Sequence, residues 1–165
     1  MTYLLWLSQT APAVWARESE SIWAYPTILF LHTLGLGVLV GFTTAIDFRI
    51  LGFSSRMPLA PMARFFRLVW VGFWINALSG TALLVLAPAK LSNPTFIVKL
   101  ACIGLGVVTM VWIKREVFPP RLTGTPEKSD VSTLAKILAV SSLVLWAGAI
   151  TAGRLMAYLG NGNPR

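Results

Sequence analysis

Residues 22–46 read IWAYPTILFLHTLGLGVLVGFTTAI, an apolar stretch that holds no Asp, Glu, Lys or Arg and has the histidine of the chain, His32, near its middle. A stretch of this length crosses a bilayer, since about 20 helical residues span the hydrocarbon core. Three further stretches have the same character, at residues 65–87, 95–113 and 134–157. The sequence therefore predicts an all-α, polytopic membrane protein: a bundle of four transmembrane helices within residues 22–158.

The composition argues against the soluble classes of protein. Apolar residues make up 56% of the 165 positions and charged residues 12%, whereas a soluble domain carries about 25% charged residues. The net charge of +8 does not indicate nucleic-acid binding, because no basic stretch interleaves aromatic residues on a soluble element. One cysteine, one histidine and six acids offer neither a zinc site nor a nucleophile–base–acid set. We expect a non-enzymatic protein whose main partner is the lipid bilayer.

The basic residues are distributed unevenly over the connections between spans. Nine of the 14 Lys and Arg residues follow the first and third spans, and five lie on the other side. Because cytoplasmic loops are enriched in Lys and Arg, the sequence predicts that both termini face the periplasm. Asp47 lies at the inner end of the first span, where an unpaired carboxylate is unfavourable. We expect it to pair across the hairpin with Arg49, Arg64 or Arg67.

The segments outside the spans carry signals of their own. Residues 1–21 are too short to cross a membrane, and Thr10 is predicted to cap a short helix begun by Pro12. This segment is predicted to be an interfacial amphipathic helix on the outer leaflet. Three tryptophans suit that interface: Trp6, Trp15 and Trp23. Asn93, followed by proline, predicts the start of the third span, and residues 159–165 are predicted to form a flexible tail.

Several polar side chains fall in the outer half of the predicted bundle. His32 lies about 15 Å below the outer end of its span, given 1.5 Å of rise per residue. Tyr25, seven residues earlier, shares its helix face. Lys99 stands one turn into the third span, and Arg154 and Tyr158 close the fourth. The sequence thus predicts a polar pocket open to the periplasm, with an imidazole below two cations.

A b-type haem suits this layout. It needs an axial imidazole inside the bundle and counter-charges for its propionates nearer to water. His32 is the predicted axial ligand of the haem iron, and Lys99 and Arg154 are the predicted propionate partners. Gly35, one turn from His32, is expected to let the flat macrocycle approach the helix. The sequence leaves four possibilities for the second axial ligand: Met110, Met156, His32 of a second copy, or no protein ligand.

Small residues spaced by four recur in three spans and predict close helix packing. They are Gly37 with Gly41, Gly72 with Asn76 and Gly80, and Ala149 with Gly153. On a helical wheel Gly37 and Gly41 point away from His32. The first span is therefore predicted to pack through the Gly37 face and to offer the His32 face to a ligand.

Two other functions stay open. In the first, the protein is a structural or accessory subunit: His32 bonds a neighbouring helix, and the outer cations extend to the headgroups. In the second, it is an oligomeric transporter or channel for a small anionic solute, lined by Asn76, His32 and Arg154. Four spans enclose little volume, so we expect a homo-oligomer or a subunit of a larger membrane complex.

The sequence also carries a family resemblance. Its motifs are HTLGLG (32–37), DFRILG (47–52), NPTF (93–96) with Lys99, and GRLMAY (153–158). Together they resemble a group of small four-span bacterial inner-membrane proteins of unknown function. The first motif is also similar to the start of copper-resistance-D-type membrane domains and other b-type haem bundles, which commonly carry more histidines. The resemblance implies a four-helix fold in the bacterial inner membrane and assigns no activity.

Overall fold

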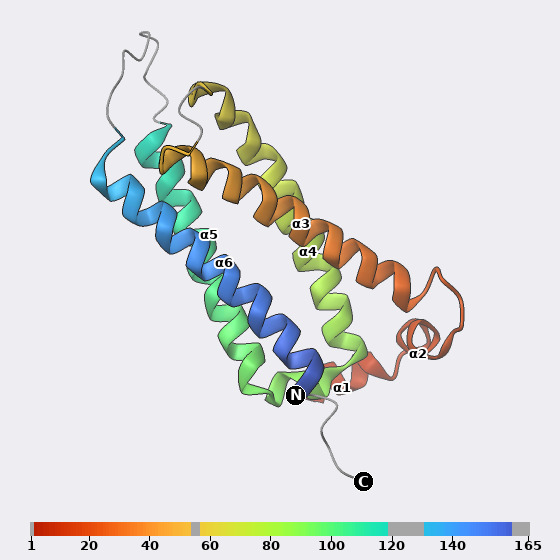
Figure 1. The fold of residues 1–165 in the computed structure, drawn as a ribbon. Coiled ribbons are helices and arrows are strands. Elements are labelled where there is room, and N and C mark those ends of the chain that lie inside the picture. Colours follow the sequence, from red (N-terminus) through yellow and green to blue (C-terminus); the bar gives the residue numbers. More distant parts are fainter. Residues whose placement is uncertain (1, 54–56, 119–130, 160–165) are drawn as a thin grey trace.

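Four long helices dominate the computed structural model, which describes residues 2–53, 57–118 and 131–159 (Figure 1). They are α3 (Tyr25–Ile50), α4 (Phe65–Leu86), α5 (Pro94–Val117) and α6 (Thr133–Leu159). Each is long and apolar enough to cross a membrane. The predicted all-α, four-span fold is therefore confirmed, and its predicted bounds differ from the observed ones by four residues at most.

Two short helices precede the first span, and they lie against the C-terminal end of α4. We call this end of the bundle the outer end and the opposite one the inner end, as labels for the two ends only. They are α1 (Thr2–Ser8) and α2 (Ala11–Glu18). Ala13 and Ala16 are buried against Leu86 of α4. In Figure 1 α2 is seen almost end-on, so it runs crosswise to the long helices. Thr10 occupies the N-cap position of α2, but its hydroxyl donates to the Leu7 carbonyl at 2.7 Å, so its side chain does not cap the helix as predicted.

The ends of the long helices follow from local chemistry. Asn93 caps α5, because its side-chain oxygen accepts a hydrogen bond from the backbone N–H of Thr95 at 2.9 Å. Pro94 then opens the helix, which confirms the predicted start. After α3, Gly52 has φ +94°, a conformation that glycine adopts without strain. Two short 3-10 helices lead into and out of α4: η1 (Ala60–Arg64) and η2 (Pro88–Ser92).

The four spans form two hairpins that meet along one side. α3 packs along α4, α5 packs along α6, and α3 contacts α6, while α4 and α5 make little contact. Most of the buried apolar core lies in the half of the bundle near the end of α3 and the start of α6. Its members include Leu39, Ile46, Ile50, Phe66, Met110, Ile113, Ala139 and Trp146. In the outer half packing is looser: no residue of α3 before Gly35 is buried, and none of α5 before Gly106.

α3 and α4 approach each other closely at Gly35 and Gly72. A Cβ atom added to Gly35 would lie 2.6 Å from the backbone nitrogen of Asn76 and 2.9 Å from the Gly72 carbonyl oxygen. A Cβ added to Gly72 would lie 2.7 Å from the backbone nitrogen of Leu39. Small residues allow membrane helices to come this close and to gain van der Waals contact. The two backbones therefore touch at this crossing.

Replacing Gly35 with alanine is expected to destabilise the bundle by about 1–3 kcal/mol, because the added methyl group forces two backbones apart. The matched control is Gly104→Ala in α5, where an added Cβ would have no atom within 4 Å. The measurement is reversible denaturation of both purified variants in detergent. Equal stability of the two variants would contradict the close backbone contact.

Candidate functional site

His32 and Asn76 hold each other across the α3–α4 interface. The ring Nδ1 of His32 lies 3.0 Å from the backbone carbonyl oxygen of Asn76. In return, the side-chain amide of Asn76 donates to the backbone carbonyl of His32 at 2.8 Å. Each side chain thus bonds to the backbone of the other residue. We call this pair of hydrogen bonds the His32–Asn76 clasp.

The clasp determines which ring nitrogen of His32 carries the hydrogen. A carbonyl oxygen cannot donate, so Nδ1 must be the donor to Asn76. The Ser79 hydroxyl, 3.3 Å from Nδ1, donates its own hydrogen to the Ile75 carbonyl at 2.6 Å and so accepts from the ring as well. In the neutral ring Nε2 is then an acceptor with a free lone pair. It has no hydrogen-bond partner within residues 2–53, 57–118 and 131–159.

The ring is also positioned by a glycine of α4. A Cβ added to Gly80 would lie 2.9 Å from His32 Cε1 and 3.3 Å from Nδ1, so the imidazole rests directly on that backbone. The predicted small-residue face of α4 is therefore the face that contacts α3, with Gly72 and Gly80 on either side of Asn76. Ser79 was not among the predicted site residues. It follows Asn76 by three positions on the same helix.

Lys99 of α5 packs against α6. Its side chain extends along Gly153, where an added Cβ would lie 3.7 Å from its Cδ, Cε and Nζ atoms. α3, α5 and α6 thus each bring a residue of the predicted site into the outer half of the bundle.

The other predicted site residues lie in more exposed surroundings. The Arg154 guanidinium donates to the Tyr158 hydroxyl at 3.4 Å, one turn along α6, and both side chains are exposed. Tyr25, at the start of α3, is also exposed and forms no hydrogen bond with His32 within the described ranges. Of the three residues proposed to line a pore, the structure joins His32 and Asn76, whereas Arg154 contacts Tyr158.

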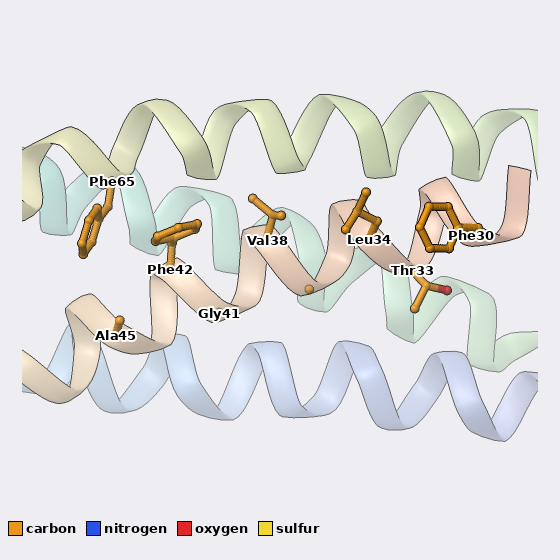
Figure 2. A pocket seen from close by; sticks show the side chains of 9 residues that line it. Phe30, Thr33, Leu34, Val38, Gly41, Phe42, Ala45 and Phe65 are labelled. Carbon is orange, nitrogen blue, oxygen red and sulfur yellow. The ribbon is translucent and has the colours of Figure 1, made fainter. Parts of the chain in front are cut away.

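The glycines of α3 have the opposite roles from those predicted. Gly35, expected to face a macrocycle, lies in the contact with α4, while Gly37 and Gly41 have no atom within 4 Å of an added Cβ. They line an apolar groove of about 700 Å³ on the outward face of α3 (Figure 2). Its wall also includes Phe30, Thr33, Leu34, Val38, Phe42, Ala45 and Phe65. The prediction that Gly37 and Gly41 pack against a neighbouring span of the same chain is wrong.

Asp47 forms no ion pair with Arg49, Arg64 or Arg67. Its side chain is fully buried and faces Ser142 of α6, and neither carboxylate oxygen has a hydrogen-bond partner among the described residues. Within the described part of the chain the one ion pair is Arg17 with Glu18. α3 continues as a helix to Ile50, and this directs Asp47 into the α3–α6 contact with Thr43 and Ile46. The predicted pairing across the hairpin is therefore wrong.

Comparison with known proteins identifies no family for this chain. No family model, curated protein or solved structure matches the chain. The family resemblance thus rests on the short motifs alone. The sequence and the structure establish a polytopic membrane protein with four candidate spans packed as a bundle.

The His32–Asn76 clasp predicts that each of the two side chains stabilises the α3–α4 pair on its own. Because each hydrogen bond ends on a backbone carbonyl, alanine at one position leaves the other bond in place. We expect His32→Ala and Asn76→Ala each to lower the stability by about 0.6 kcal/mol, with about 1.7 kcal/mol as the upper end, and the double variant to lose nearly the sum. The control is Thr33→Ala, since the Thr33 hydroxyl bonds within its own helix to Leu29. Stability is measured by denaturation in detergent, and losses in His32→Ala and Asn76→Ala no larger than in Thr33→Ala would refute the clasp.

Proposed function

We propose that the protein binds a b-type haem in the outer half of the bundle and supports electron transfer in the membrane. The observation that carries the proposal is the state of His32: its Nδ1–H is bonded to a backbone carbonyl, and its Nε2 lone pair is free. Metal-ligating histidines are held in this way, because the hydrogen bond at one nitrogen orients the other toward the metal. Nε2 of His32 is the proposed axial ligand.

The surroundings of His32 fit such a ligand. The Asn76 carbonyl fixes the ring and raises its basicity as a ligand. Lys99 provides a cation for one propionate, and Arg154, which follows Gly153 in α6, is assigned to the other. α3 before Gly35 and α5 before Gly106 bury no residue, so a haem in this half would not displace a packed core from these two helices. A bound haem supplies one-electron chemistry, and the protein supplies the ligand, the counter-charges and the apolar surroundings.

The position of Met110 argues against this residue as the second axial ligand. Met110 is 2% exposed within the core cluster of the inner half, where it packs with Ile113 and Trp146. We therefore remove it from the candidates. The proposal keeps three alternatives for this position: Met156 in the outer half of α6, His32 of a second copy, or no protein ligand. Within this proposal the termini face the periplasm of a bacterial inner membrane, as the distribution of Lys and Arg predicts.

An absorption spectrum tests the proposal. Protein purified from cells with ample haem supply is expected to show a Soret band that His32→Ala abolishes and that added imidazole restores, because imidazole fills the space left by the side chain. Thr33→Ala, on the exposed face of the same helix, serves as the control and should keep the band. Colourless, folded wild-type protein, or an unchanged band in His32→Ala, would overturn the proposal.

A structural or accessory role is the second candidate, and two observations favour it. The His32–Asn76 clasp stabilises the α3–α4 pair without any ligand, and the groove at Gly37 and Gly41 offers a small-residue face to a helix of a second copy or of a larger complex. The variant His32→Gln separates the two candidates, because its amide can still donate to the Asn76 carbonyl. Two results together support the structural role: the wild type is colourless, and His32→Gln is as stable as the wild type.

A further inference from the structure

A second cavity lies at the opposite end of the bundle, between α4 and α5. It has a volume of about 640 Å³, and its lining consists of Ala63, Arg64, Phe66, Arg67, Trp70 and Lys114. Three of these six residues are cations. Arg64 and Arg67 come from the junction of η1 and α4, and Lys114 comes from the last turns of α5.

The cations of this cavity have no acidic partner among the residues that the structure describes. None of them forms an ion pair with a described residue. The ammonium group of Lys114 instead lies 5.7 Å from the centroid of the Phe66 ring. Three positive charges that converge on one cavity repel each other, and an anion in their midst relieves that repulsion. Arginine and lysine side chains together favour a phosphate group, which accepts several charge-assisted hydrogen bonds.

The position of the cavity favours a lipid as the source of that phosphate. It lies at one end of two helices, α4 and α5, that make little contact along the rest of their length and that are apolar enough to cross a membrane. Phe66 and Trp70 provide the aromatic part of its wall, as is usual at the depth of the headgroups. Basic pockets between transmembrane helices at this depth bind anionic headgroups.

We propose that the α4–α5 cavity binds the phosphate of one anionic phospholipid, with the acyl chains lying along the open α4–α5 side. Arg64 and Arg67 bond the phosphate oxygens, and Lys114 adds the third charge from the facing helix. The lipid closes the side of the bundle that the helices leave open. This proposal does not depend on haem binding, because its residues lie at the other end of the spans.

Native mass spectrometry of the detergent-purified protein tests the site. With phosphatidylglycerol we expect one retained lipid and a higher melting temperature, and with phosphatidylcholine neither. Replacing Arg64, Arg67 and Lys114 with glutamine is expected to weaken phosphatidylglycerol binding about fivefold for each cation removed. The matched control carries Arg115→Gln and Lys136→Gln, two exposed cations at the same end that do not line the cavity. It should bind like the wild type.

Three results would overturn the proposal. The first is equal retention of the two lipids by the wild type. The second is equal loss of binding in the triple variant and in the control. The third is displacement of phosphatidylglycerol by inorganic phosphate alone, which would assign the cavity to the free ion. If the triple variant does not fold, phosphatidylglycerol binding is measured on Lys114→Met instead. This side chain is exposed and packs on the Phe66 ring, so its replacement should leave the fold intact. Unchanged binding by that variant refutes the site.

Discussion

The contact between α3 and α4 is the interaction on which the rest of the structure depends. Lipid provides no hydrophobic drive for two apolar helices to associate, so close packing and interhelical hydrogen bonds must hold them together. Both are present here: Gly35 and Gly72 bring the backbones into contact, and the His32–Asn76 clasp lies about one turn away. The same contact orients the imidazole. The structural bond uses Nδ1 of His32, so the same histidine keeps Nε2 for the metal ligation that we propose.

The bundle combines a tightly packed inner half with a loosely packed outer half. Trp146 rests on Gly106 and fills the centre of the inner half, where Asp47 is also enclosed. Beyond this level α3 and α5 bury no residue, and His32 and Lys99 lie in these parts of the two helices. At the inner end a cavity lies between α4 and α5, where three cations converge. The two candidate sites thus lie at opposite ends of the bundle.

The sequence predicts the helices well and their contacts poorly. Hydropathy and length locate all four spans, and Asn93 with Pro94 marks the start of α5, because these signals are local. Span geometry also predicts that His32 and Lys99 fall in the same half of the bundle, with the imidazole below the cation. The helical wheel, in contrast, separates the Gly35 and Gly37 faces without saying which of them meets a neighbour. Asp47 shows the same limit: its arginines are near in sequence, but the rotation of α3 turns it toward Ser142. Arg154 donates a hydrogen bond to Tyr158. The sequence indicates that these two residues share a helix face, because they are four positions apart.

Nitrogen NMR of the histidine side chain tests the central claim most directly, and the chain is suited to it because His32 is the one histidine. With ¹⁵N-labelled histidine in a detergent or lipid sample, the account predicts a neutral ring that is protonated at Nδ1 and unprotonated at Nε2. Addition of haem should then perturb the Nε2 resonance most strongly. A ring protonated at Nε2 and free at Nδ1, or one that exchanges rapidly between both forms, would contradict the clasp and the haem ligand together.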